Sequence, residues 1–474
     1  MTLHTGLTEE IRSGPSGPKV GAFFDLDQTL LAGFSASAFL RERFVSGRMS
    51  PRELVESGLG LLGFEIGRIG FSGLITATTA AYRGLSEHVL EELGHEVFEK
   101  YLATQIYPES RALVRAHQER GHTVAVVSSA TRYQVVPFAE SLGIEHVLCT
   151  ELEVVDGVFT GRVVRPTCYG EGKALAARTL SSRPDLELEQ SYFYTDSHED
   201  LPLLAAVGRP RPLNPSRKLA QIAKERRWPV RRFHSRGTPS LGDWLRTSLV
   251  YGSLLPATAA GVAAGLVNTS WREGLNVAGS IWGDLATSLA GIDLRVEGEE
   301  HLWSQRPAVF VFNHQSALDA ILMIKLLRRD MTGVGKREIQ HNPVFGPLFT
   351  AAGVVFIDRG HTGRAIEALR PAVQALREGR SLVIAPEGTR SLTPRPGPFK
   401  KGAFHIAMQA RVPIVPVVFK NVLDALPKDA LLVRPATIEA VVLPPVDTSA
   451  WTRDRLDDEI RAIREAYLRV LDRD

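Results

Sequence analysis

The chain has 474 residues, long enough for two or three domains at the usual size of about 150 residues each. Its composition, with 44% hydrophobic and 23% charged residues, is that of an ordinary globular protein. A net charge of +3 is compatible with anionic lipid or phosphate ligands, but it is too small to indicate a nucleic-acid-binding protein.

The two cysteines, Cys149 and Cys168, cannot supply a disulfide framework, which points to a reducing compartment. Residues 1–18 are polar, contain glycine and proline, and carry no apolar core of signal-peptide length. We therefore expect a disordered leader over residues 1–18 and a protein exposed to the cytoplasm.

A short apolar run over residues 19–24 predicts a buried strand that leads directly into Asp25 and Asp27. Side chains two residues apart at a strand end point to the same side, because side chains alternate along a strand. Two carboxylates held so close need a cation or a shared proton. Since Asp-x-Asp is also common in surface loops, this pair alone does not establish a site.

Three later clusters stand where predicted strands end or a predicted helix begins. Ser128 follows a strand over residues 123–127, Lys173 opens a helix, and Asp196 and Asp200 follow a strand over residues 192–195. Together with the first motif, and in this order, they resemble the haloacid dehalogenase-type phosphatases, in particular the phosphoserine phosphatase-like members. The resemblance covers about residues 19–233, so we expect a phosphatase domain over residues 19–236 with a doubly wound parallel sheet.

The resemblance also implies a role for each motif. Asp25 would attack phosphorus to form an aspartyl-phosphate, and Asp27 would protonate the leaving alcohol and later activate water. Ser128 and Lys173 would hold the phosphoryl oxygens.

Mg²⁺ is the cofactor that the resemblance implies, and it is a hard cation that prefers oxygen ligands. Asp25, the carbonyl of Asp27 and Asp196 would hold it. Asp200 would be a further acidic partner of the same metal site.

Residues 33–106 correspond to the helical cap that closes over the site in this family, and helices are expected at 41–44, 51–62 and 88–101. Phe34 stands where phosphoserine phosphatases carry a glutamate that helps to recognise the amino group. The segment 59–74 is apolar and rich in glycine. We hypothesise a substrate less polar than phosphoserine, such as a lysolipid phosphate, although packing of the cap core explains the apolar segment equally well.

The region 237–292 is expected to link two domains. Just before it, basic residues crowd the stretch 209–236, either as a solvated helix face or as a contact for anionic headgroups. Residues 247–271 contain no charged residue, and a second apolar segment follows at 275–289. The lengths permit a membrane span of ~20 residues, but the composition is only weakly apolar. A buried helical hairpin, a hairpin that attaches the protein to a membrane peripherally or monotopically, and a true span all stay open, and membrane attachment is the interpretation we favour.

Residues 293–474 alternate between predicted strands and helices, which is typical of an α/β layout with helices covering a sheet. Three blocks carry polar residues: His-x4-Asp at 314–319, Phe-Ile-Asp-Arg at 356–359 and Pro-Glu-Gly-Thr-Arg at 386–390. These blocks resemble the glycerolipid acyltransferases, in particular the 1-acylglycerol-3-phosphate acyltransferases.

Acyl transfer from a thioester to a hydroxyl needs a base near the alcohol, and an imidazole suits because its ordinary pKa of ~6.5 lies near neutral pH. His314 is therefore the candidate base, and Asp319 would orient its ring as in serine-type triads. Because the substrate hydroxyl would be the nucleophile, no acyl-enzyme is required. Ser316 to Asp319 also fits a helix capping box, a structural role that could compete for Asp319.

Arg390 and Arg359 suit a phosphate on the acceptor, because guanidinium forks match phosphate oxygens. The remaining candidates for acceptor binding are a glycine that lets the backbone approach, a hydroxyl donor, a glutamate placed there by the resemblance, and a further lysine: Gly388, Thr389, Glu387 and Lys336.

The sequence thus predicts a fusion of an Mg²⁺-dependent phosphatase with an acyltransferase at the cytoplasmic face of a membrane. The acyltransferase would convert lysophosphatidate to phosphatidate with acyl-CoA or acyl-carrier protein, and no nucleic acid partner is expected. One alternative is that the first half is a non-catalytic module. Another is that it acts on an unrelated substrate, such as phosphoserine or a soluble phosphate ester.

Overall fold

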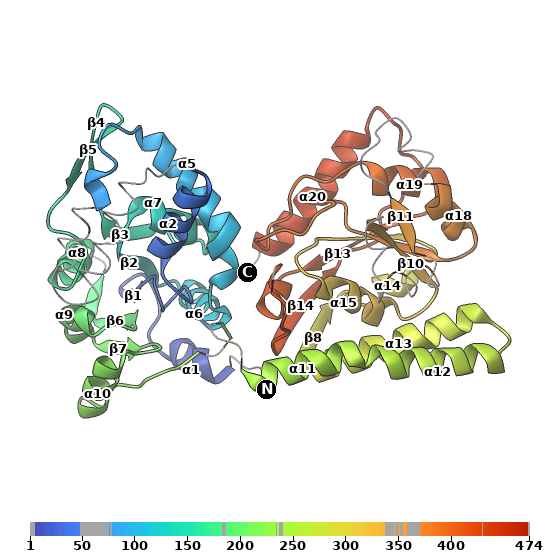
Figure 1. Cartoon of the computed structure of the whole chain (residues 1–474), viewed down its shortest axis with the longest axis horizontal. Coiled ribbons are helices and arrows are strands. Elements are labelled where there is room, and N and C mark those ends of the chain that lie inside the picture. The colour runs from blue at the N-terminus through green and yellow to red at the C-terminus, as the bar shows by residue number, and fades with distance from the viewer. Residues whose placement is uncertain are drawn as a thin grey trace. The chain divides into compact units, whose positions relative to one another are not determined.

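A computed structural model describes residues 5–47, 75, 78–182, 186–233, 235, 236, 240–336, 346, 350, 354–357, 370–428 and 430–472. The chain divides into two compact units, Met1–Thr238 and Pro239–Asp474 (Figure 1). Each unit is built around its own sheet, so each is described by itself.

The first unit contains a five-stranded sheet in the order β3-β2-β1-β6-β7, in which every neighbouring pair is parallel. The strands are β1 (Val20–Phe24), β2 (Thr123–Thr131), β3 (His146–Thr150), β6 (Glu187–Thr195) and β7 (Arg209–Pro212). The chain fills one side of β1 first and then crosses to the other side with β6. This order confirms the doubly wound parallel sheet.

Helices cover both faces of this sheet, as parallel sheets require. They are α1 (Thr5–Ser13), α6 (Pro108–Glu119), α7 (Arg132–Ser141), α8 (Glu171–Ser181), α9 (Leu201–Ala206) and α10 (Arg217–Glu225). One apolar core includes residues of α1, α6 and α7, and a second includes residues of α8, α9 and α10.

Helix α1 corrects the expectation of a disordered leader, because residues 5–13 are helical. Ile11 is buried in the core beneath this helix, and Glu10 is paired with Arg211 of β7. Buried side chains and ion pairs therefore hold the segment on the first unit. The polar composition of the leader hid this amphipathic face.

The described part of the cap consists of α2 (Ser35–Val45), α5 (Glu87–Val97), a π-helical turn (Phe98–Leu102) and a 3-10 turn (Ala103–Gln105). A hairpin of β4 (Leu152–Val155) and β5 (Val158–Val163) packs on α5 through Leu90 and Phe159. The helix expected at 51–62 and the apolar segment at 59–74 lie outside the described residues.

The second unit begins with a helical hairpin of α11 (Leu241–Gly252), α12 (Leu254–Val267) and α13 (Trp271–Ala290), and α12 and α13 run side by side (Figure 1). Glycines let the two backbones approach closely. A Cβ on Gly261 would lie only 2.6 Å from the carbonyl oxygen of Gly274. The expected apolar hairpin is therefore present.

The second sheet has the order β11-β10-β12-β9-β13-β14-β8, and all neighbours are parallel except β13 and β14. Its strands are β8 (Ile292–Glu297), β9 (Val309–Phe312), β10 (Met331–Lys336), β11 (Val355–Ile357), β12 (Ser381–Ile384), β13 (Ile414–Phe419) and β14 (Ala436–Val442). The central strand β9 lies between β12 and β13, and its four residues are all buried.

Two apolar cores lie on the two faces of this sheet. One joins it to the hairpin and to α15 (Leu318–Leu327), and the other to α18 (Arg370–Arg377), α19 (Gly402–Ala410) and α20 (Leu456–Asp472). The short elements α14 (His301–Ser304) and a 3-10 turn (Val422–Asp424) complete the unit. The layout is the α/β fold expected for residues 293–474.

Candidate active sites

The first candidate site lies where the strand order of the first sheet reverses. β1 and β6 are neighbours, and Asp25 follows β1 while Asp196 follows β6. The backbone N–H of Asp25 donates to the carbonyl of Tyr194, which continues the pairing of the two strands by one step. Open α/β sheets form their ligand-binding crevices at such carboxyl edges.

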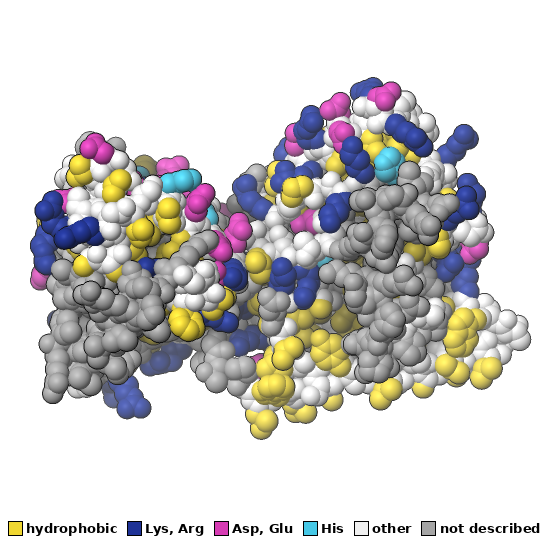
Figure 2. Space-filling view, turned by 45° about the horizontal axis from the view of Figure 1, so that its top comes forward, with side chains coloured by type: hydrophobic (Ala, Val, Ile, Leu, Met, Phe, Trp, Pro, Cys, Tyr) yellow, Lys and Arg dark blue, Asp and Glu magenta, His cyan; other side chains and the backbone are white. Residues whose placement is uncertain are grey.

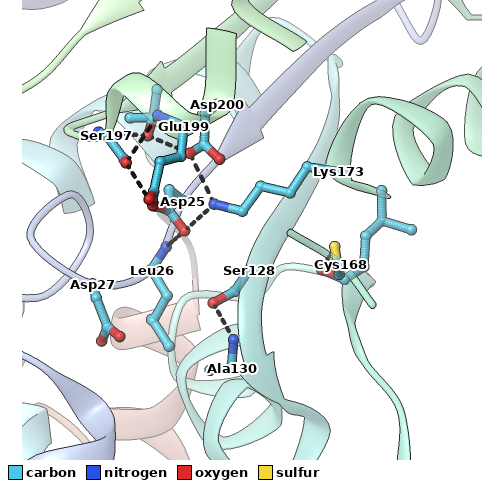
Figure 3. Close-up of polar contacts among 12 residues, drawn as sticks. Asp25, Leu26, Asp27, Ser128, Ala130, Cys168, Lys173, Ser197, Glu199 and Asp200 are labelled. Atoms are coloured by element: carbon cyan, nitrogen blue, oxygen red, sulfur yellow. Dashed lines mark hydrogen bonds and ion pairs between the residues drawn. The ribbon is translucent and has the colours of Figure 1, made fainter. Parts of the chain in front are cut away.

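Lys173 connects two of the candidate carboxylates. Its ammonium lies 2.9 Å from Asp25 Oδ1 and 2.9 Å from Asp200 Oδ2, and all three side chains are buried (Figure 3). Burial alone would lower the pKa of Lys173, but the negative charges of Asp200 and Asp25 raise it above its usual value. Lys173 is therefore a permanent cation beside Asp25.

Asp200 is held by the same lysine and by a hydroxyl. Its Oδ2 atom also accepts a hydrogen bond from Thr195 Oγ1 at 2.6 Å. The oxygen that faces Lys173 is thus already engaged twice. This geometry suits a residue that positions Lys173, whereas Asp200 was expected beside a metal ion.

Asp27 is bound to the first turn of the cap helix α2. Its Oδ1 atom accepts from the backbone N–H of Ser35 at 2.7 Å, and Oδ2 lies 3.3 Å from the hydroxyl of Ser35. Helix-terminal N–H groups need such acceptors, so Asp27 links the edge of the sheet to the cap. In Figure 3 it lies apart from the Lys173 ion pairs.

Ser128 is buried near the end of β2, and its hydroxyl oxygen accepts from the backbone N–H of Ala130 at 3.2 Å. A hydroxyl that accepts in this way keeps its own proton for donation to an anion.

The carboxylates of this site are difficult to ionise together. Burial raises the pKa of Asp196 to about 8, with the charge of Asp25 adding to it, and burial raises the pKa of Asp27 to about 6. Burial also raises the pKa of Asp25, against the opposing effect of Lys173. The site has four candidate carboxylates and one ammonium, which pairs with two of them, so a hard divalent cation would balance the charge.

Within the described ranges, no three Asp, Glu, His or Cys side chains are grouped closely enough to form a metal site by themselves. A cation held by Asp25 and Asp196 would need further ligands, such as the Asp27 carbonyl. The oxygen donors fit Mg²⁺ in kind.

The second candidate site contains His314 and Asp319. His314 follows β9, and its Nδ1 atom lies 2.8 Å from Asp319 Oδ2 in the first turn of α15. The same oxygen accepts the backbone N–H groups of Gln315 and Ser316 at 2.7 and 2.8 Å. Burial raises the pKa of Asp319, and the hydrogen bond from His314 opposes that effect.

Asp319 thus makes one contact of the expected capping box and also contacts His314, but the box is incomplete, because the Ser316 hydroxyl accepts the N–H of Leu318. One carboxylate oxygen satisfies N–H groups at the start of α15 and also meets the imidazole of His314. The helix start fixes the carboxylate, and the carboxylate fixes the ring.

The loop after β12 holds the backbone of His314 from both sides. Glu387 Oε1 accepts the N–H of His314 at 2.8 Å, and the N–H of Ser391 donates to the carbonyl of His314 at 2.6 Å. Glu387 Oε2 accepts the N–H of Gly397 at 2.8 Å, and the side chain is buried. Both carboxylate oxygens thus bind the protein's own backbone.

The rest of this loop presents the other expected contacts. Gly388 adopts a φ of +74°, Thr389 is exposed, and the guanidinium of Arg390 donates to the carbonyl of Lys428. Lys336 ends β10, but its side chain and the whole of Arg359 lie outside the described residues. The structure therefore places Gly388, Thr389 and Arg390 beside the His314 loop and does not describe the other two.

Two stretches of the chain match known families. Residues 22–205 match the haloacid dehalogenase-like hydrolases, and residues 293–420 match the acyltransferases. A 1-acyl-sn-glycerol-3-phosphate acyltransferase of Limnanthes douglasii is 38% identical over 197 residues, which cover 41% of this chain and 69% of the relative. A probable phosphatase of Mycobacterium tuberculosis is 34% identical over 218 residues, covering 45% of this chain and 76% of the relative. The chain belongs to both families.

A crystal structure of the lysophosphatidate acyltransferase PlsC from Thermotoga maritima is 22% identical to this chain. It covers 48% of this chain and 97% of its own, with a TM-score of 0.41. The two family matches and the two sequence relatives show an enzyme that combines a dehalogenase-like phosphatase unit with an acyltransferase unit.

The sequence did not point to several residues that shape the acyltransferase site. Asn313 exchanges two hydrogen bonds with the backbone of Phe419, at 2.8 and 2.7 Å, and Gln315 Nε2 donates to the same Phe419 carbonyl at 2.7 Å. These bonds join the His314 loop to the end of β13. Polar residues on both sides of a histidine after a buried strand were the available signal.

Lys400 was also not identified. A Cβ on Gly388 would lie 3.0 Å from its ammonium nitrogen, so its side chain passes over the glycine of the Glu387 loop. It adds a cation beside Gly388.

Proposed function

We propose that the acyltransferase unit transfers an acyl chain from acyl-CoA or acyl-carrier protein to 1-acylglycerol-3-phosphate and forms phosphatidate. The contact between His314 Nδ1 and Asp319 Oδ2, at 2.8 Å, carries this proposal. An ionised carboxylate only accepts hydrogen bonds, so Nδ1 carries the proton and Nε2 is left to act as a base. The named activity of the Limnanthes relative supports the choice of substrate.

The proposed reaction is a direct transfer. The acceptor hydroxyl attacks the carbonyl carbon of the thioester while His314 Nε2 takes the hydroxyl proton. The carbon–sulfur bond then breaks, and the leaving thiolate receives that proton, so that an ester and a free thiol are formed. Asp319 stabilises the imidazolium between these steps. Arg390, Thr389 and the backbone at Gly388 would bind the phosphate of the acceptor, with Lys336 and Arg359 as further candidates.

The phosphatase unit is proposed to hydrolyse a phosphomonoester. Asp25 attacks phosphorus, the bond to the leaving alcohol breaks, and Asp27 gives the alcohol its proton. Asp27 then takes a proton from the water that hydrolyses the aspartyl-phosphate. Lys173 and Ser128 counter the charge on the phosphoryl oxygens.

Asp25, the Asp27 carbonyl and Asp196 would hold Mg²⁺ in the phosphatase unit. When bound, the ion would supply positive charge beside the transferred phosphoryl group. The buried ion pairs among Asp25, Lys173 and Asp200 favour a working site over a non-catalytic module, because such a network has no evident structural need.

Attachment to a membrane surface belongs to the same proposal. Leu241–Val267 is long and apolar enough to span a bilayer. Only 28% of its most apolar 18-residue stretch is buried inside the protein, so most of that stretch is available to contact lipid. Hydrophobic side chains gather along the hairpin (Figure 2). Those exposed on it include Leu241, Leu245, Leu255, Leu266, Val267 and Trp271. A monotopic or peripheral position at the cytoplasmic face would cover them and bring the site to its lipid acceptor.

The fusion further suggests that the two units act in sequence, with acylation followed by dephosphorylation to diacylglycerol. The test supplies chain-labelled 1-acylglycerol-3-phosphate, acyl-CoA and Mg²⁺ to the membrane-bound wild type and to His314→Ala and Asp25→Asn. His301→Ala and Asp293→Asn serve as matched controls, because their side chains pair with Glu300 and Arg295 and carry none of the proposed roles.

Diacylglycerol from the wild type and phosphatidate from Asp25→Asn would support the two-step enzyme. Equal phosphatidate from both would keep the transferase and assign the phosphatase another substrate, such as phosphoserine or a soluble ester. Acyl incorporation that is the same in the wild type and His314→Ala would overturn the acyltransferase assignment.

A further inference from the structure

An open cavity of 440 Å³ lies at the opposite edge of the second sheet from His314. We call it the arginine pocket; it is lined by Trp303, Arg306, Pro307, Arg329, Asp330 and Gly379. Pro307, Asp330 and Gly379 come just before β9, β10 and β12, whereas His314 and Glu387 follow β9 and β12. The arginine pocket is therefore separate from the candidate acyl-transfer site.

Positive charge exceeds negative charge around the arginine pocket. Asp330 pairs with Arg272 at 2.5 Å and with Arg329 at 3.2 Å, and Glu378 pairs with Arg380 at 3.0 Å. Among the residues that line the pocket, the guanidiniums of Arg306 and Arg329 carry positive charge and Asp330 is the one carboxylate. An anion is the ligand that would balance the excess.

Arg306 is more buried than Arg329, the other cation that lines the pocket. It donates to the carbonyls of Leu327 and Arg329 at 3.2 and 3.0 Å, and within the described residues it forms no ion pair. Burial lowers the pKa of its guanidinium to about 10. Its guanidinium carbon lies 4.3 Å from the centre of the Trp303 ring, which fixes the orientation of the cation.

The wall of the arginine pocket is tied to the apolar end of the hairpin. Arg272 donates to the carbonyls of Glu378 and Gly379, each at 3.2 Å, and it directly follows Trp271. Leu266 and Val267, at the end of α12, are 74% and 83% exposed. Exposed leucine, valine and tryptophan beside a basic cavity are typical of a site where lipid chains and headgroups meet.

We propose that the arginine pocket binds the phosphate headgroup of an anionic phospholipid while the end of the hairpin contacts the acyl chains. A phosphate matches the donor geometry of guanidinium groups. A soluble phosphate ester would use the same cations but not the exposed apolar side chains, so the bilayer is the source that fits both. This inference rests on the proposed membrane attachment and adds a lipid class to it.

The test measures partitioning of the full chain onto phosphatidylcholine vesicles with and without phosphatidylglycerol. Phosphatidylglycerol is neither the acceptor nor a phosphomonoester, so it does not report on either active site. Arg329→Glu is the main variant, because the Arg329 side chain is 64% exposed and is paired with Asp330. Arg295→Glu changes the net charge equally at an exposed position on β8 and is the matched control. Arg306→Gln is a second variant in the pocket.

Arg329→Glu should lower affinity for the anionic vesicles on the order of tenfold, with binding to neutral vesicles unchanged and Arg295→Glu close to wild type. An equal loss of affinity for anionic vesicles in Arg329→Glu and Arg295→Glu would overturn the proposed headgroup site and indicate general charge attraction instead. Inorganic phosphate is tested as a competitor at constant ionic strength. Saturable phosphate binding that Arg329→Glu removes, without any change in vesicle affinity, would reassign the pocket to a soluble ligand.

Failure of the underlying proposal looks different. If the wild-type protein binds neither the neutral nor the anionic vesicles, the proposed membrane attachment itself is overturned. Acyl transfer in detergent micelles reports separately on the acyltransferase, and it should be the same for Arg329→Glu and the wild type.

Discussion

Glu387 Oε1 accepts the backbone N–H of His314 at 2.8 Å, while its other oxygen accepts the N–H of Gly397. The glutamate of the Pro-Glu-Gly-Thr-Arg block therefore holds the histidine loop in place. The resemblance had assigned it to acceptor binding, and kinetics can separate the two roles.

Glu387→Gln is expected to lower kcat by roughly 10–100-fold with little change in KM for the acceptor, because an amide offers only one acceptor oxygen to two N–H groups. The measurement is the kcat and KM of acyl transfer. Glu439→Gln, at a partly exposed site paired with Lys420, is the control. A raised KM at unchanged kcat would instead assign Glu387 to acceptor binding.

Asp319→Asn should retain the fold and lose most of the activity. Asparagine still offers an oxygen to the N–H groups of Gln315 and Ser316, but it cannot stabilise an imidazolium at His314. We expect kcat to fall by roughly 10²–10⁴-fold. Circular dichroism and thermal unfolding check the fold. A kcat that falls by no more than about threefold from the wild-type value would contradict the charge-stabilising role.

The phosphatase unit should show stability that depends on both pH and Mg²⁺. An unfolded aspartate has a pKa of ~3.9, whereas the pKa of Asp27 is raised to about 6 and that of Asp196 to about 8. Between about pH 4 and pH 8 the folded state therefore binds more protons than the unfolded state, so its stability falls as pH rises.

Calorimetry in EDTA should show a Tm for this unit that is lower at the alkaline end of that range than at the acidic end. Added Mg²⁺ should raise Tm most at the alkaline end, where the carboxylates are charged. Asp25→Asn identifies the transition, because it removes one carboxylate and should reduce the effect of Mg²⁺. A Tm that responds to Mg²⁺ equally at both ends would contradict a carboxylate-bound cation.

The sequence located the chemical groups better than the elements between them. Asp25, Asp196, His314 and Glu387 each follow a buried apolar run, and such runs can be recognised without a structure. β9 and β12 are neighbours only through pairing between distant parts of the chain. The hydrogen bond between Glu387 and the His314 backbone could therefore not be predicted from the sequence. The same holds for Asp200, whose contact with Lys173 joins segments 27 residues apart.

Several elements lacked a sequence signal for a physical reason. β7 reads Arg-Pro-Arg-Pro, and proline is compatible only with an edge strand, which is where β7 lies. β10 contains Gly333 and Gly335, and its sequence shows no alternation of apolar and polar residues that would indicate a strand.

The hairpin offers a test of close helix packing. A Cβ on Gly261 would lie 2.6 Å from both the Ala278 Cβ and the Gly274 carbonyl oxygen, whereas one on Gly252 would meet nothing within 4 Å. Alanine in an open helical position usually stabilises by about 0.5–1 kcal/mol relative to glycine. Gly252→Ala should therefore raise the stability of the second unit slightly.

Gly261→Ala should do the opposite and lower the free energy of unfolding by roughly 1–3 kcal/mol, because α12 must move away from α13. The measurement is thermal unfolding in detergent, followed by acyltransferase activity after brief heating. α13 also contacts α15 through the ion pair of Asp284 with Lys325 at 2.9 Å. Movement of α12 away from α13 should therefore also disturb α15, the helix that carries Asp319, and lower the activity. If Gly261→Ala raises Tm as much as Gly252→Ala does, the close packing of α12 against α13 at Gly261 is contradicted.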